Sequence, residues 1–288
     1  MSEMIFLNPE IRGACYLAKS EEAAVLFDPG MAYYADITIE KVKKLLGERP
    51  LYAVFLTHSH YDHVGALPYI RRCWPGVKVY GADYARKVLV KPAARETILD
   101  LSREAAENNG RILDPSYPSE LLFVDEIVKD GDEIEIGDMT IKVIESVGHT
   151  RCSLSFIIDD EILLAAESIG TLGVHGEYMP QFLVDYGKTL ETIRKCRKLG
   201  DKQLWLSHHG AVGQTSEELW QWFEDELVKA KDIILSIIRD YSLPEEQLEA
   251  MAKNFWRPKR KGGWPRPAFD LNAQAMLRTI AREFTTEK

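Results

Sequence analysis

The pattern H-x-H-x-D-H, formed by His58, His60, Asp62 and His63, constrains this chain more than any other feature of its sequence. It follows directly on an apolar run at 51–56, whose length suits a strand buried on both faces. In extended backbone the first two histidines project to the same side, and the Asp-His pair follows where a helix would begin. So many polar side chains converge at low cost only around a cation or in solvent. The pattern therefore predicts a metal site at the end of this strand.

Three further candidate ligands, His149, Glu167 and His209, each stand at the end of a later apolar segment. Loops at strand ends are where side chains carried by a rigid sheet meet. Taken alone, a histidine in such a place is more often a hydrogen-bonded structural residue, and a lone glutamate is usually solvated. Their joint fit to one site is what makes them candidates.

Strand-like and helical segments alternate up to about residue 212, and the chain is helical from residue 215 onward. Thr215 and Glu218 form a candidate capping box for the first of the late helices. The pattern predicts an α/β body over 1–212 and a C-terminal helical appendage over 213–288. We expect strands at 13–18, 23–28, 51–56, 77–80, 127–129, 133–136, 140–146, 154–158, 162–166 and 203–206, and helices at 37–46, 65–73, 82–109, 185–199 and 268–284.

The charge balance is acidic, since 36 Lys and Arg stand against 45 Asp and Glu and the formal net charge is −9. Long-range repulsion therefore disfavours nucleic acids and anionic membranes as partners. The first residues lack the features of a signal peptide, and no apolar run approaches the roughly 20 residues of a membrane span. Four scattered cysteines without a C-x-x-C pair are typical of reduced thiols in a cytoplasmic protein: Cys15, Cys73, Cys152 and Cys196.

In the order and spacing of its motifs, over about residues 12–212, the chain resembles the metallo-β-lactamase-fold hydrolase superfamily. The matching segments are 57–63, 148–150, the acid at Glu167 and 209–210. The resemblance implies an αββα sandwich that holds two divalent metal ions in a groove at the sheet edge. It also implies the ligands: His58, His60 and His149 for the first ion, Asp62, His63 and His209 for the second, and Glu167 as the bridge.

The chain departs from the family pattern at two positions. Glu167 stands where the family usually has aspartate, and its extra methylene changes the geometry of a bridging carboxylate. His208 stands where the first glycine of a Gly-His-Gly motif is common, so we favour His209 as the ligand and keep His208 as a supporting or substituting residue. The segment 67–70 and the helical tail near 275–281 also look similar to the branch that contains the quinolone-signal-response protein PqsE, which has thioesterase activity.

Histidine and carboxylate ligands without cysteine suit zinc, iron or manganese. Two such ions lower the pKa of a water molecule, and the hypothesis is that Asp62 orients the resulting hydroxide toward an acyl carbonyl, with a thioester as the preferred substrate. The basic segment from Lys253 to Arg266 is either a solvated loop or a phosphate clamp for a substrate linked to coenzyme A. The alternatives are a lactonase, an iron-dependent oxidoreductase, or a regulatory protein with a vestigial metal site. The C-terminal helices are also a candidate homodimer interface.

Overall fold

The computed structural model of the 288-residue chain describes residues 2–11, 13–173, 175–256 and 266–285. The chain forms two compact units. The first contains Met1–Glu145 and Leu154–Leu164, and the second contains Ser146–Ser153 and Ala165–Lys288. These units are defined by contacts within the fold, whereas the predicted domains, 1–212 and 213–288, stay a prediction.

The first unit is built on a sheet in which antiparallel and parallel pairing meet. Its strands follow the chain order β1-β2-β3-β4-β5-β6. The first three pair antiparallel, and each neighbour from β3 to β6 pairs parallel. Parallel neighbours need a crossover, and α1 to α5 supply the helices of these crossovers. The strands are β1 (Glu3–Phe6), β2 (Tyr16–Lys19), β3 (Ala24–Phe27), β4 (Ala53–Phe55), β5 (Lys78–Gly81) and β6 (Glu126–Ile127).

An antiparallel meander completes the first unit's strands: β7 (Glu133–Ile136), β8 (Met139–Glu145), β9 (Leu154–Ile158) and β10 (Ile162–Ala165). Aromatic rings pack it against the first sheet. The ring of Phe156 on β9 lies 5.2 Å from Phe27 on β3 and 5.5 Å from Phe55 on β4, measured between centroids. All three side chains are fully buried, so the core of this unit lies between two layers of strands.

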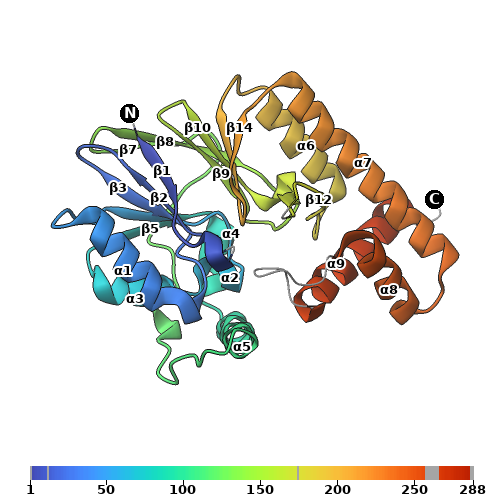
Figure 1. The fold of residues 1–288 in the computed structure, drawn as a ribbon, viewed down its shortest axis with the longest axis horizontal. Helices are drawn as coiled ribbons and strands as arrows, with labels where there is room; N and C mark the ends of the chain where they lie inside the picture. Colours follow the sequence, from blue (N-terminus) through green and yellow to red (C-terminus); the bar gives the residue numbers. More distant parts are fainter. Residues whose placement is uncertain (1, 12, 174, 257–265, 286–288) are drawn as a thin grey trace. The chain divides into compact units, whose positions relative to one another are not determined.

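Among the described residues, five helices form the crossovers of the first unit, and a proline separates the last two. They are α1 (Ala35–Leu46), α2 (Tyr61–Val64), α3 (Leu67–Cys73), α4 (Asp83–Leu89) and α5 (Pro92–Asn108), and Figure 1 shows α1 and α3 on one face of the first sheet. The helix expected over 82–109 is two helices. Pro92 has no N–H and its ring would overlap the preceding turn, so a new helix starts at this proline.

The second unit is largely helical. Helix α7 (Glu217–Asp240) packs beside α6 (Tyr186–Arg197), and it also contacts α8 (Pro244–Phe255) and α9 (Arg266–Phe284), as Figure 1 shows. Its strands are the short pair β11 (Thr171–Leu172) and β12 (Tyr178–Met179), and the hairpin of β13 (Gln203–Leu206) and β14 (Gly210–Gln214). The cap of α7 differs from the prediction by one residue, because Ser216 and not Thr215 accepts the hydrogen bond from Leu219 N.

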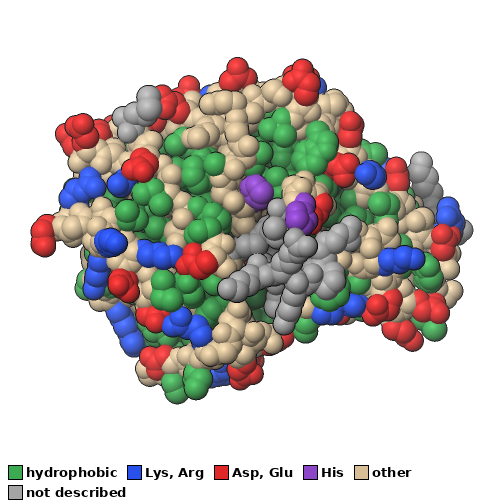
Figure 2. All heavy atoms as spheres, in the orientation of Figure 1, with side chains coloured by type: hydrophobic (Ala, Val, Ile, Leu, Met, Phe, Trp, Pro, Cys, Tyr) green, Lys and Arg blue, Asp and Glu red, His purple; other side chains and the backbone are tan. Residues whose placement is uncertain are grey.

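Charged side chains cover the surface in mixed order. Figure 2 shows acidic and basic groups interspersed over the face drawn, with apolar side chains between them. Across the described ranges, the structure contains no helix that combines the length and the apolarity needed to cross a bilayer. All four cysteines are free thiols, and burial raises the pKa of Cys196 to about 12.

Candidate metal centre

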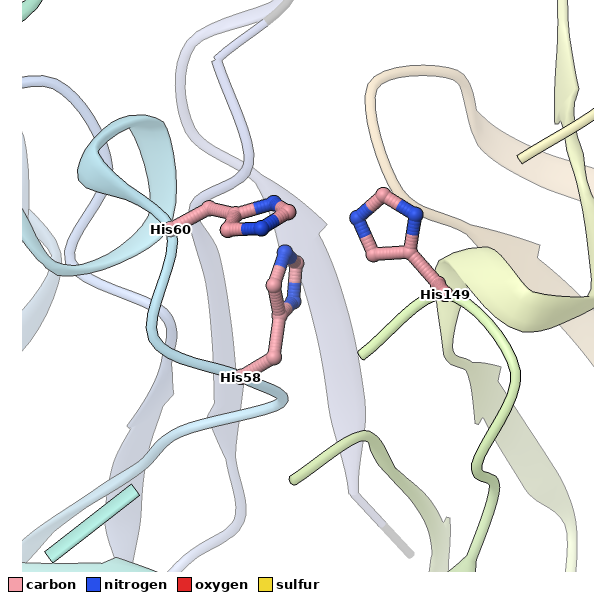
Figure 3. A group of neighbouring side chains, drawn as sticks. All are labelled: His58, His60 and His149. Atoms are coloured by element: carbon pink, nitrogen blue, oxygen red, sulfur yellow. The ribbon is translucent and has the colours of Figure 1, made fainter. Parts of the chain in front are cut away.

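In the first unit, the loop after β4 brings three of the predicted histidines together. His58 lies in this loop, His60 precedes the first residue of α2, and His63 lies within that helix. The ring centroid of His58 is 4.6 Å from that of His60 and 3.9 Å from that of His63. Figure 3 shows the rings of His58 and His60 next to each other. The same-side projection that the spacing predicted is therefore confirmed for this pair.

Asp62 lies at the edge of this group of histidines. Its side chain is 20% exposed, and its Oδ2 lies 3.9 Å from Nε2 of the fully buried His63. Burial raises the pKa of the neighbouring Tyr61 phenol well above its usual range, and the negative charge of Asp62 adds to that shift. Tyr61 therefore keeps its proton at neutral pH.

Asp28, at the end of β3, holds this loop in place. It is fully buried, and its carboxylate accepts hydrogen bonds from Thr57 N at 2.8 Å and Thr57 Oγ1 at 2.6 Å. It also accepts from His63 Nδ1 at 2.8 Å. Because the Thr57 hydroxyl directs its proton to Asp28, its oxygen is left to accept from Nδ1 of His58 at 3.0 Å. These contacts assign the proton of both histidines to Nδ1.

In the second unit, His149 is held by main-chain and side-chain bonds in the loop between β8 and β9. Its Nδ1 donates to Gln181 O at 2.8 Å, and its backbone N donates to Ser168 Oγ at 2.9 Å. The imidazole is 1% exposed. This histidine therefore has the same arrangement as the two of the first unit, with Nδ1 bonded to an oxygen. Figure 3 shows its ring extending from this loop.

Glu167 joins two histidines of the second unit. It begins the short 3-10 helix after β10 and is 4% exposed. Its Oε2 lies 3.4 Å from His149 Nε2, and its Oε1 lies 2.9 Å from His208 Nε2. His208 is buried and adopts a left-handed φ of +63° in the turn between β13 and β14. The longer glutamate side chain is thus compatible with a position between two imidazoles.

The ring of His208 reaches Glu167. His209 is only partly buried, and its assignment as a ligand stays a prediction. The sequence did not identify Asp28, Thr57 or Gln181 as supports of the ligands. The available signal for Asp28 was an acidic residue directly after β3. This strand pairs parallel with β4, which leads into the histidine loop. A main-chain carbonyl such as that of Gln181 has no side-chain signature.

The basic segment falls largely outside the described residues, where Arg257, Lys259, Arg260, Lys261 and Trp264 lie. Arg266 is described and has carboxylate partners. Its guanidinium donates to Glu249 Oε1 and to Asp270 Oδ1, each at 2.7 Å, and lies 5.4 Å from the ring centroid of Trp256. These contacts give Arg266 a structural role at the start of α9.

Comparison with known proteins identifies the family. The sequence profile of the metallo-beta-lactamase superfamily matches residues 9–202. The metallo-beta-lactamase fold-containing protein ST1585 of Sulfurisphaera tokodaii is 27% identical over 217 residues, which cover 71% of this chain and 75% of the relative. The hydroxyacylglutathione hydrolase of Francisella tularensis subsp. novicida is 25% identical over 210 residues, which cover 72% of this chain and 67% of the relative.

The fold is similar to that of a solved structure over nearly its whole length. The crystal structure of ST1585 from Sulfolobus tokodaii, an archaeal metallo-beta-lactamase superfamily protein, covers 98% of this chain and 98% of its own, with a TM-score of 0.59 and 17% identity. The alignment includes the C-terminal helices, and it confirms the predicted α/β sandwich with a helical appendage. The profile match over most of its length shows that the chain belongs to the metallo-β-lactamase superfamily.

Proposed function

We propose that this protein is a metal-dependent hydrolase whose candidate histidine and carboxylate ligands bind two divalent ions. His58, His60 and His149, the side chains drawn in Figure 3, are the proposed ligands of one ion. Asp62, His63 and His208 are those of the other, with His209 as the alternative to His208, and Glu167 is the proposed bridge.

One observation carries this proposal. Three buried histidines are each anchored through Nδ1 to an oxygen, His58 to Thr57, His63 to Asp28 and His149 to Gln181. Metal-binding histidines have this arrangement, because the second ring nitrogen fixes the tautomer and the direction of the ligand atom. Nitrogen and carboxylate donors fit zinc, iron or manganese. When bound, such ions lower the pKa of a water molecule and polarise a carbonyl.

The protein's own contribution is to orient the reactants. In this proposal the carboxylate of Asp62 orients the attacking water and accepts its proton, which its partial exposure allows. We infer a thioester as the substrate. Support comes from the hydroxyacylglutathione hydrolase of Francisella tularensis, whose name describes an acyl group on the glutathione thiol. A substrate linked to coenzyme A and a homodimer through the C-terminal helices stay predictions.

The test combines metal analysis with hydrolysis of matched probes. Purified protein is assayed by inductively coupled plasma mass spectrometry and then with thioester, lactone and phosphodiester substrates. We expect close to two transition-metal ions per chain and turnover of the thioester above the other probes. His60→Ala should lower kcat/KM by at least about a hundredfold, since it removes a proposed ligand. His175→Ala is the matched control, because His175 is exposed in the segment between β11 and β12.

Two results would contradict the proposal. One is protein that retains no transition metal and gains no hydrolysis when zinc, iron or manganese is added. The other is equal loss of activity in His60→Ala and His175→Ala. Preferential turnover of the lactone or phosphodiester would support hydrolase activity but would contradict the thioester as the substrate.

A further inference from the structure

Helix α9 is tied by side-chain hydrogen bonds to the chain segment 181–187 of the same unit. Thr279 Oγ1, on a residue that is 1% exposed, donates to Leu183 O at 2.9 Å. Arg282 Nη2 donates to Val184 O, the next carbonyl along the segment, at 2.6 Å. Glu283 accepts from the backbone N–H groups of residues 186 and 187 at 3.1 and 3.3 Å. One face of α9 therefore fixes the backbone of this segment.

The same segment orients His149. Gln181, at its start, accepts the Nδ1 proton of His149 on its main-chain oxygen at 2.8 Å. The Gln181 side chain is 1% exposed and is held at both ends, because its Nε2 donates to Thr171 Oγ1 and its Oε1 accepts from Asn272 Nδ2 of α9, each at 3.4 Å. The buried amide thus links α9 directly to the residue that bonds the imidazole.

The peptide group before His149 is held by this segment as well. Gly148 O accepts from Val184 N at 3.0 Å and from Asp185 N at 3.3 Å. Both the ring and the backbone of His149 are therefore fixed by residues 181–185, whose own position is set by α9. A displacement of this segment changes where Nε2 of His149 points, since a rigid hydrogen bond sets the ring orientation.

We infer that α9 is a positioning element for His149, and that Thr279 and Asn272 are positioning residues that act through the segment 181–187. This inference rests on the proposed function, in which His149 is a metal ligand. The helical appendage then contributes to the metal centre by fixing the direction of one ligand, without supplying a ligand of its own.

The test compares Thr279 of α9 with Thr285, which directly follows the last residue of that helix. Thr279→Val removes the hydroxyl that bonds Leu183 O and keeps nearly the same side-chain shape. Thr285→Val is the matched control, because Thr285 Oγ1 bonds only Ala281 O, one turn back on α9, among the contacts described. The first readout, in the metal-free full chain, is the exchange rate of the His149 imidazole N–H by nitrogen-15 NMR. The second is the zinc Kd by competition with a chromophoric chelator.

We expect Thr279→Val to speed the imidazole exchange and to raise the zinc Kd, each by about tenfold, which is the usual effect of losing a partner that orients a ligand. Thr285→Val should change neither by more than about twofold. Asn272→Ala is the second variant. It removes the bond to Gln181 Oε1 from a partly exposed residue, so α9 should keep its packing.

Unchanged imidazole exchange in both Thr279→Val and Asn272→Ala, with native circular dichroism, would overturn the inference. So would equal changes in Thr279→Val and Thr285→Val. The exchange measurement needs no metal, so a wild-type chain that binds no zinc would refute the proposed function and leave the positioning role of α9 to be decided by the NMR data.

Discussion

Gly148 brings the His149 loop closer to the first turn of α6 than any side chain allows. Its φ is +143°, and a Cβ at this position would lie 2.8 Å from Thr189 Cα. Gly213 in β14 has nearly the same φ, +138°, but nothing lies within 4 Å of a Cβ there. We expect Gly148→Ala to lower the free energy of unfolding by about 3 kcal/mol and Gly213→Ala by about 1 kcal/mol, because only the first adds overlap to backbone strain.

Urea unfolding of the two variants in metal-free buffer measures this difference. Equal losses of unfolding free energy in the two variants would mean that backbone strain alone accounts for the destabilisation and that the loop can move away from Thr189. A larger loss at Gly148 would show that this close approach is rigid, as the two hydrogen bonds to Gly148 O indicate.

At the scale of single residues, the sequence indicates candidate ligands but not the groups that orient them. His58 and His60 are found from spacing alone, because residues i and i+2 of an extended segment share a face. The supporting role of Asp28 can be inferred only when the pairing of β3 with β4 is known, and this pairing joins segments far apart in the sequence. The contact of His208 with Glu167 is also beyond the sequence, because it depends on a turn in which His208 has a φ of +63°.

Among the helices, α7 offers a direct test of its start signal. Ser216 Oγ accepts from Leu219 N at 3.2 Å, whereas Thr215 Oγ1 accepts from Lys202 N at 2.9 Å and so belongs to the end of the hairpin. We expect Ser216→Ala to lower the free energy of unfolding by about 1 kcal/mol and Ser216→Asp to leave it nearly unchanged, because aspartate caps as well as serine. Thermal or urea unfolding of the two variants measures these changes in free energy. Equal destabilisation by both substitutions would exclude a capping role.

The elements that the sequence predicts well are those with a strong hydrophobic period. The hairpin across Asp159 and Asp160 is an example, since β9 and β10 are buried throughout, are apolar except at Ser155, and pair antiparallel as expected. Strand β14 was missed because it contains two glycines and one large apolar residue, and its register against β13 shifts between Leu204 and Trp205. Strand β1 was missed too, and its place is set by pairing with β2.

For the whole molecule, metal binding and folding stability are linked. A ligand that binds only the folded chain adds about 2.7 kcal/mol to the free energy of unfolding at 100 times its Kd. We therefore expect zinc to raise the Tm of chelator-treated protein by roughly 5–10 °C in differential scanning calorimetry. Magnesium should have little effect, because it prefers oxygen ligands and most of the proposed donors are imidazoles.

His60→Ala is the control for this shift, since it removes a proposed ligand whose side chain is only partly buried. It should abolish most of the zinc-dependent rise while the metal-free Tm stays close to that of the wild type. An equal rise with magnesium, or an undiminished rise in His60→Ala, would contradict a specific zinc site at these histidines.

The left-handed backbone at His208 has a cost in conformational stability. Four described non-glycine residues have a positive φ. Asp28, at +51°, and His208 contact candidate ligands, whereas Asp159 and Asp160 form an ordinary hairpin turn. Such a backbone costs a residue with a Cβ roughly 1–2 kcal/mol that glycine does not lose. Selection for stability alone would favour glycine at position 208. In return for this conformational cost, position 208 carries an imidazole that contacts the buried Glu167 carboxylate.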